Sequence, residues 1–263
     1  FYEQGISEEL EKIMDEKENY ASRDNNNISI PITKNDKWER KYNSQIVYPI
    51  ISDGDAIGSC LAMKVALKQL GKNADVIIRE VPKIFDFLPY RDEIKSDSDI
   101  KKYDLAISLD CADFKRLVGS EYFENAKQTI VIDHHGSNKM YGEINFVNPV
   151  APACCQILIG MFQYFNINID KELGTCILTG IITDTGGFRY SGVTPETFEF
   201  TADLLQKGVN VSDIYKRALE TKTKANFELM KRTLNRMEIL EDGKVTFTYI
   251  TNEDLEEVNA RNR

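Results

Sequence analysis

The sequence predicts an α/β protein built on an open, mostly parallel sheet with helices on both faces. Short apolar runs recur between residues 46 and 132, and segments with helical periodicity separate them. Such nearly continuous apolar runs are typical of parallel strands that are covered on both sides. The chain of 263 residues is 42% hydrophobic and 29% charged, which fits one large globular domain or two smaller ones.

The predicted elements follow one another in a regular order. Strands are expected at residues 46–51, 74–81, 105–109 and 129–132. The first helix runs from about Ala56 to Leu70, where Gly71 supplies a common C-terminal stop. Beyond residue 153 the chain is mostly helical, with helices expected at 154–165, 171–182, from Thr194-Pro195 onward, 211–220 and 225–240. Residues 244–250 then alternate like a strand, and residues 251–254 resemble a helix capping box.

Charge and cysteine content narrow the class of protein. Lys and Arg total 33 and Asp and Glu total 42, so the net charge of −9 argues against a protein that coats long nucleic acid. No apolar run approaches the roughly 18–20 residues that span a bilayer, and the polar start lacks a signal-peptide pattern. The five cysteines fit no disulfide framework and read as small apolar core residues of a reducing compartment. We therefore expect a cytoplasmic protein without membrane contact.

Acidic residues and both histidines of the chain follow the predicted strands. Because the carboxyl ends of parallel strands meet at one edge of a sheet, these side chains are expected to converge. Converging carboxylates repel one another unless a cation neutralises them, and oxygen ligands with imidazole suit Mn²⁺ or Mg²⁺. The residues concerned are Asp53 and Asp55 after the first strand, Asp110 after the third, and Asp133, His134 and His135 after the fourth.

One more segment, residues 183–190, adds Asp184, a Gly-Gly pair and Arg189. Each of these motifs alone has an ordinary structural interpretation: a turn, a helix N-cap after a strand, or a helix C-terminus with a glycine stop. Their joint occurrence within one α/β region favours a functional site instead.

Four segments resemble, in order and spacing, the motifs of the DHH phosphoesterase superfamily. They are residues 53–59 (DGDAIGS), 109–113 (LDCAD), 132–135 (IDHH) and 183–190 (TDTGGFRY). The resemblance extends over roughly residues 46–240 and is closest to the bacterial nanoRNase, pAp phosphatase and cyclic-di-AMP phosphodiesterase branch. It implies a two-Mn²⁺ phosphoesterase, with Mg²⁺ as an alternative ion, that acts on short oligoribonucleotides, dinucleotides or pAp.

The resemblance also assigns roles to individual residues. It implies Asp53, Asp55, Asp110, His134 and Asp184 as metal ligands, with Asp110 bridging both ions. His135 is expected to face the scissile phosphate, while Asp133 orients the site by holding His134 or nearby backbone. Arg116 and Arg189 are candidate phosphate clamps.

Domain organisation follows from the same resemblance. We expect a peripheral segment at residues 1–45, the DHH catalytic domain at 46–195, a helical linker at 196–240 and the start of a C-terminal substrate domain at 241–263. The glycine-rich, His-containing loop of that substrate domain is absent from these residues, so the nucleotide substrate is not specified. A homodimer is one arrangement that is left open.

The sequence departs from the family pattern at Pro49. The family places a metal-binding His four residues before Asp53, and the chain has no further His to replace it. We expect one tight Mn²⁺ site and one weak site, unless a His-containing stretch near Pro49 is absent from the sequence. Two other functions stay open: a catalytically weak nucleotide sensor or scaffold, and a family II inorganic pyrophosphatase. A Ser-Arg-Lys-Lys-Gln-type motif, which the latter would carry near its C-terminus, is missing.

Overall fold

The fold is a parallel α/β sheet, as predicted. The computed structural model describes residues 45–48, 53–100, 102–117 and 119–259. Its 6-stranded sheet has the order β3-β2-β1-β4-β5-β6, and every neighbouring pair in it is parallel. The strands are β1 (Gln45–Tyr48), β2 (Ala74–Ile77), β3 (Ile94–Lys95), β4 (Leu105–Leu109), β5 (Thr129–Asp133) and β6 (Ile144–Val147).

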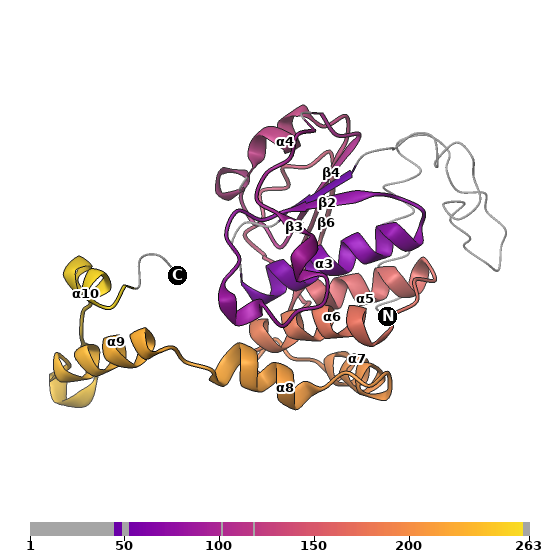
Figure 1. Cartoon of the computed structure of the whole chain (residues 1–263). Helices are drawn as coiled ribbons and strands as arrows, with labels where there is room; N and C mark the ends of the chain where they lie inside the picture. The colour runs from indigo at the N-terminus through magenta and orange to yellow at the C-terminus, as the bar shows by residue number, and fades with distance from the viewer. Residues whose placement is uncertain (1–44, 49–52, 101, 118, 260–263) are drawn as a thin grey trace.

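Helices cover both faces of this sheet (Figure 1). One face carries α3 (Gly54–Gln69), α5 (Cys154–Tyr164) and α6 (Lys171–Asp184), and the other carries α4 (Ser120–Asn125). Each face of the sheet has its own hydrophobic core. Alternate residues of β4 pack into one core or the other, because successive side chains of a strand point to opposite faces. Ile107 packs in the core under α3, α5 and α6, whereas Ala106 packs with Tyr122 and Phe123 of α4.

Glycines let α3 and α6 approach closely. A Cβ atom at Gly58 would clash with the backbone carbonyl of Cys176, and one at Gly180 would lie 2.5 Å from Asp55 Oδ1. Only a residue without a side chain fits such gaps, since real Cβ contacts are longer. The contact brings the first turn of α3, which carries Asp55, beside the last turns of α6, which ends at Asp184.

Beyond α6 the chain is helical and then forms a small hairpin unit. The elements are α7 (Pro195–Gln206), α8 (Val211–Tyr215), a π-helical turn (Lys216–Glu220), α9 (Lys224–Asn235), β7 (Glu238–Leu240), β8 (Val245–Phe247) and α10 (Asn252–Glu257). Thr194 precedes α7 with Pro195 as its first residue, and Thr251 and Asp254 form a capping box at α10, as the sequence predicted. Short 3₁₀ turns also occur at Lys83–Phe85, Arg91–Glu93, Phe114–Arg116 and Glu241–Gly243.

Several predicted boundaries are wrong. The helix expected at 225–240 ends at Asn235, because residues 238–240 pair antiparallel with 245–247. The helix expected at 211–220 becomes π-helical from Lys216, and the strand expected at 74–81 ends at Ile77. Strands β3 and β6 were not predicted. The end of the first predicted strand, residues 49–51, lies outside the described residues.

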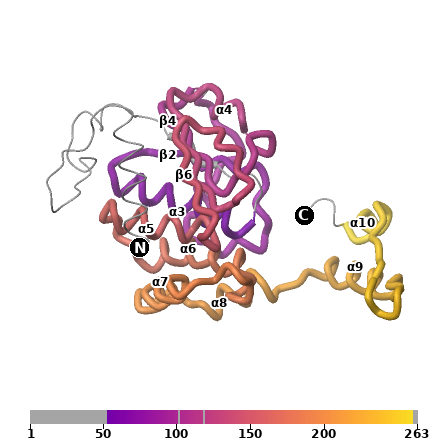
Figure 2. Tube along the Cα trace, turned by 180° about the vertical axis from the view of Figure 1, so that it is seen from behind, coloured from indigo at the N-terminus to yellow at the C-terminus, as the bar shows by residue number. Residues whose placement is uncertain are grey.

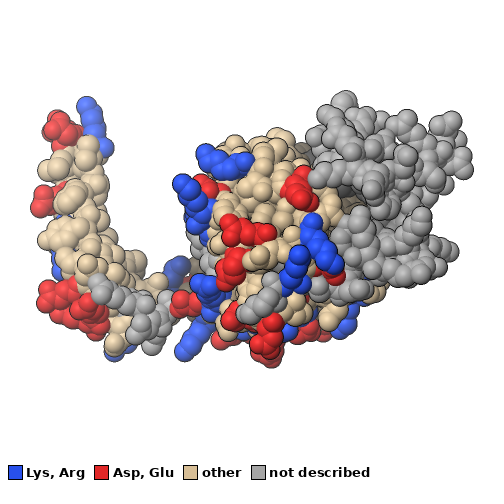
Figure 3. Space-filling view, turned by 90° about the horizontal axis from the view of Figure 1, so that it is seen from above, with Lys and Arg blue, Asp and Glu red and all other residues tan. Residues whose placement is uncertain are grey.

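The unit formed by α9, β7, β8 and α10 stands apart from the sheet in both views (Figures 1 and 2). Its apolar side chains are largely exposed: Phe227 is 54% exposed and Ile239 is 64% exposed. In Figure 3 uncharged surface on this unit lies between clusters of acidic side chains and a few basic ones. Over the described ranges, every helix is too short or too polar to cross a bilayer.

Candidate metal centre

Four of the predicted metal ligands, Asp55, Asp110, His134 and Asp184, converge at the carboxyl edge of the sheet. The fifth, Asp53, belongs to neither group of potential metal ligands among the described residues. β1, β4 and β5 are adjacent in the strand order, and Asp110 follows β4 while Asp133 ends β5. Asp53 is the N-cap of α3, the helix that follows β1, and its Oδ1 accepts a hydrogen bond of 2.9 Å from Ala56 N. The strand order reverses between β1 and β4, which is where open α/β sheets bind their ligands.

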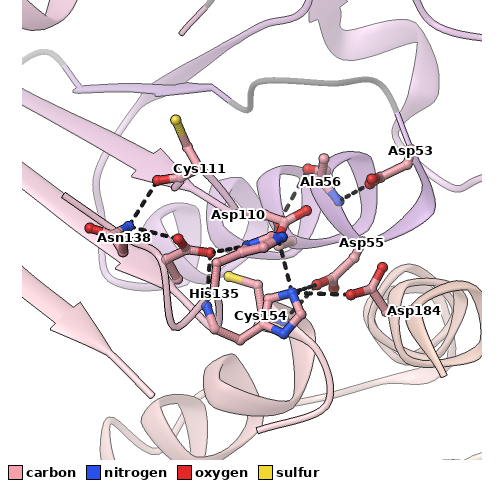
Figure 4. Close-up of polar contacts among 12 residues, drawn as sticks. Asp53, Asp55, Ala56, Asp110, Cys111, His135, Asn138, Cys154 and Asp184 are labelled. Carbon is pink, nitrogen blue, oxygen red and sulfur yellow. Dashed lines mark hydrogen bonds and ion pairs between the residues drawn. The ribbon is translucent and has the colours of Figure 1, made fainter. Parts of the chain in front are cut away.

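His134 lies at the centre of this group. Its Nδ1 is 3.3 Å from the carbonyl oxygen of Ala151, and its Nε2 is 3.3 Å from Asp110 Oδ1 and 3.0 Å from Asp184 Oδ2. Asp55 Oδ2 lies 4.0 Å from the same nitrogen. In Figure 4 Asp55, Asp110 and Asp184 lie around one point, to which they come from three different elements.

Two buried atoms at this point are unpaired within the described part of the chain. Neither Asp110 Oδ1 nor His134 Nε2 has a hydrogen-bond partner of normal geometry among the described residues. Buried polar atoms are usually hydrogen-bonded, and a metal-binding His commonly donates its other ring nitrogen to a carbonyl. His134 has that second arrangement if Nδ1 carries the proton, since Ala151 offers a carbonyl there. The donor set of carboxylate oxygens with one imidazole nitrogen therefore fits Mn²⁺ or Mg²⁺.

Electrostatics of these acids favour a cation as well. Burial, together with Asp110 and Asp184, raises the pKa of Asp55 well above its ordinary value, and burial raises that of Asp110 too. Burial alone would lower the pKa of His134, but Asp110 and Asp184 outweigh it and raise this pKa to about 11. Asp53 is exposed overall, yet the protein atoms around its carboxyl group and the charge of Asp110 raise its pKa to about 6. A divalent cation would relieve this repulsion.

Asp55 is held by a helix N-terminus that the sequence analysis missed. Its Oδ2 and Oδ1 accept hydrogen bonds from Cys154 N at 2.6 Å and Cys155 N at 2.9 Å, in the first turn of α5. The N-cap residue of α5, Ala153, offers no capping side chain, so Asp55 accepts from two of the free N–H groups of this helix from a distant part of the chain. The lack of a capping residue before α5 is the one sequence signal that indicates an outside acceptor.

Asp133 has a different environment. Its Oδ1 accepts from His134 N at 2.8 Å and from His135 Nδ1 at 2.7 Å, and its Oδ2 accepts from Asn138 Nδ2 at 2.6 Å. Burial would raise the pKa of Asp133, but the hydrogen bonds from His135 and Asn138 outweigh it and lower the pKa. Asp133 therefore holds the ring of His135 as well as the backbone of His134, and the sequence analysis did not foresee the first contact.

Asp110 turns the chain sharply after β4. Its φ of 55° is in the left-handed region, which Asp tolerates better than most residues. The carbonyl oxygen of the next residue, Cys111, accepts hydrogen bonds from Asn138 Nδ2 at 2.9 Å and from the Tyr141 hydroxyl at 3.0 Å. These contacts hold the turn that aims the Asp110 carboxylate at His134.

The two arginines that are candidate phosphate clamps lie in turns that follow proposed metal ligands in the sequence. Arg116 is exposed at the end of the 3₁₀ turn that follows Asp110, and Arg189 Nε donates to the carbonyl of Gly186 at 2.7 Å in the turn after Asp184. Their contact with a substrate stays a prediction. Pro49, on which the expectation of a weak metal site depends, lies outside the described residues.

A parallel sheet with acids and two histidines gathered at its carboxyl edge defines an α/β protein with a candidate metal site. The chain belongs to the DHH family, because the profile of the DHH family, N-terminal domain, matches residues 46–181. A second profile, for the C-terminal part of stage V sporulation protein T, a transcription factor, matches residues 1–80, most of which the structure does not describe.

Relatives with known names include the bifunctional oligoribonuclease and PAP phosphatase NrnA of Thermus thermophilus, 36% identical over 70% of this chain and 55% of that protein. Its namesake in Bacillus subtilis is 25% identical over 65% of this chain and 55% of that protein. The crystal structure of an exopolyphosphatase-related protein from Bacteroides fragilis matches with a TM-score of 0.75 and 28% identity, over 85% of this chain and 70% of that one. The chain thus spans slightly more than half the length of these named relatives.

Proposed function

We propose that this protein is a Mn²⁺-dependent phosphoesterase that acts on short oligoribonucleotides, dinucleotides or pAp by a two-metal mechanism. The observation that carries the proposal is a pair of buried atoms, Asp110 Oδ1 and His134 Nε2, that have no hydrogen-bond partner among the described residues. Asp55 and Asp184 lie beside them. The substrate class is supported by the activity that the name of the Thermus relative states.

Asp53, Asp55, Asp110, His134 and Asp184 would hold the ions. When bound at such a site, divalent cations supply a nucleophile at neutral pH and charge stabilisation for an in-line displacement at phosphorus. The protein's own contribution is to fix the ligands: the N-terminus of α5 holds Asp55, and the turn after β4 holds Asp110.

His135 is the proposed catalytic residue. Its Nδ1 donates to the Asp133 carboxylate, which keeps a proton on that nitrogen and fixes the ring. The hydrogen bond to Asp133 also raises the pKa of His135, so the opposite nitrogen, Nε2, is favoured as a second N–H donor. The side chain is 45% exposed, which lets it donate a hydrogen bond to a phosphate oxygen or leaving oxygen.

One assay tests the function directly. The purified chain with Mn²⁺ is offered a linear diribonucleotide, pAp, cyclic-di-AMP and pyrophosphate in parallel. Hydrolysis of the diribonucleotide or pAp supports the proposal, and Asp184→Asn should remove it while the exposed Asp203→Asn on α7 keeps it. Hydrolysis of pyrophosphate alone would indicate a pyrophosphatase instead, and tight nucleotide binding without turnover would indicate a sensor or scaffold.

We also propose that the two ions bind unequally, because Pro49 stands where the family has a metal-binding His. The tight site would use Asp55, Asp110, His134 and Asp184, and the weak one would depend on Asp53 and Asp110. Isothermal titration with Mn²⁺ should then give two clearly different affinities. Two equal, tight sites in a protein whose intact mass matches the sequence would contradict this proposal and would require another ligand.

A further inference from the structure

Both the NH₂ group and the oxygen of the Asn138 side chain form hydrogen bonds at the border of the candidate metal centre. Its Nδ2 donates to Asp133 Oδ2 at 2.6 Å and to the Cys111 carbonyl at 2.9 Å, while its Oδ1 accepts from Met140 N at 2.7 Å. Two acceptors face the NH₂ group and one N–H faces the oxygen, so the orientation of the amide is fixed by its partners. Figure 4 shows the contact between the Asn138 amide and the carbonyl oxygen of Cys111.

These contacts join the two loops that carry the proposed chemistry. Asp133 holds the ring of His135 through Oδ1, at 2.7 Å, and receives Asn138 on its other oxygen. The Cys111 carbonyl belongs to the residue directly after Asp110, where the chain turns with a φ of 55°. One NH₂ group therefore connects the support of the His135 ring with the support of the Asp110 carboxylate.

We propose that Asn138 is a positioning residue for phosphoester hydrolysis, which keeps the His135 ring aligned with the Asp110 carboxylate. The inference rests on the proposed function. Reacting groups must be placed within a fraction of an ångström, so loosening the link between these loops should slow turnover more than it weakens substrate binding.

Two substitutions separate positioning from mere packing. Asn138→Asp keeps the shape and the acceptor for Met140 N, but it places an oxygen where Nδ2 now donates to Asp133 and Cys111. Asn138→Ala removes the whole amide without adding repulsion. We expect kcat to fall about 100-fold in the Asp variant and about tenfold in the Ala variant, within the range for residues that support a metal site, with KM changed less than kcat.

Asn145→Asp is the matched control. The Asn145 side chain also accepts from one backbone N–H and donates Nδ2 to a carbonyl, in both cases of Gly142, and it is half-buried like Asn138. The substitution therefore removes the same kind of donor outside the centre, and kcat should stay within about twofold of wild type. If packing alone mattered at position 138, the Ala variant would lose more activity than the Asp variant, and that order would overturn the proposal.

A second readout does not depend on turnover. The chain contains only two histidines, so ¹⁵N–¹H spectra of the imidazole rings, recorded with Mg²⁺, contain two ring systems to assign. Asn138→Asp should shift the His135 Nδ1–H signal or broaden it by exchange with water, and it should leave the His134 ring signals near their wild-type positions. Unchanged His135 signals in both variants would overturn the proposal. Wild-type protein that hydrolyses no phosphoester would refute the proposed function, while these spectra would still test the positioning of the ring.

Discussion

Asp110 and Asp133 are both buried carboxylates at the ends of adjacent parallel strands, but their surroundings differ. Asp133 accepts three hydrogen bonds, and they keep its pKa below the ordinary value although burial acts in the opposite direction. Asp110 has an oxygen without a hydrogen-bond partner among the described residues, and burial raises its pKa. Within this pair, the number of hydrogen-bond donors around the carboxylate, and not its burial, therefore distinguishes Asp133 as the orienting group from Asp110 as the candidate metal ligand.

The comparison extends to the two histidines. His134 points Nε2 toward Asp55, Asp110 and Asp184, whereas His135 points Nδ1 toward Asp133. The side chain of His134 is 13% exposed and that of His135 is 45% exposed. A buried nitrogen among acids suits a metal ligand, and a ring that is held on one side and open on the other suits contact with a substrate.

Asp110→Ala should have the largest effect, because it removes the carboxylate proposed to bridge both ions. We expect at least about a 100-fold loss of turnover with Mn²⁺, as for removal of a key electrostatic group. Circular dichroism should be unchanged. The stabilisation by Mn²⁺, about 2.7 kcal/mol at a concentration 100 times Kd, should also disappear from thermal unfolding.

Asp113→Asn is the control for this prediction. Asp113 lies three residues further along and caps a 3₁₀ turn by accepting from Lys115 N, a role that Asn also fills. Its activity should remain near wild type. Retention of more than about a tenth of the activity by Asp110→Ala would show that Asp110 is not a bridging ligand.

The histidine pair should give smaller and opposite effects. His134→Ala should weaken Mn²⁺ binding more than tenfold, because it removes a proposed ligand, whereas His135→Ala should lower turnover and leave Mn²⁺ affinity nearly unchanged. Calorimetric titration of both variants with Mn²⁺, together with kcat at saturating metal, separates the two roles. Equal loss of metal affinity in the two variants would show that the division between them is wrong.

Gly180→Ala should have the smallest effect of the three. The added Cβ would lie 2.5 Å from Asp55 Oδ1, so α3 and α6 must move apart at about 1–3 kcal/mol of stability, and Mn²⁺ affinity should fall with the displaced carboxylate. Gly192→Ala is the comparison, since a Cβ there meets Pro152 at an ordinary 3.8 Å. Thermal unfolding and Mn²⁺ titration of both variants are the measurements, and equal behaviour of the two would argue against a tight contact at Gly180.

The strand ends and the acids that follow them were predictable from sequence, because local apolar runs define buried parallel strands. The contacts that distinguish the acids were not. Asp55 meets Cys154 and Cys155 at sequence separations of 99 and 100 residues, and no local pattern encodes such a pairing. The sequence analysis assigned no role to Asn138, because its contacts depend on the loop after β4 folding against it.

The hairpin of β7 and β8 was not predicted from the sequence, for a different reason. Ile239 and Leu240 continue the apolar spacing of α9, so the sequence favoured a helix to residue 240. Pairing of β7 with β8 through the turn at Glu241–Gly243 overrides that preference, and Gly243 there has a φ of 86°. Helical periodicity and a short strand are hard to tell apart over so few residues.

All five cysteines are buried, so the reactivity of their thiols can report on local opening of the fold. Burial raises the pKa of Cys154 and Cys155 well above that of a free thiol, so both are protonated at neutral pH and out of reach of alkylating reagents. The backbone N–H groups of these two residues clamp Asp55. A maleimide can therefore label these thiols only when this part of the fold opens, and mass spectrometry of the labelled peptide can follow that opening without any substrate.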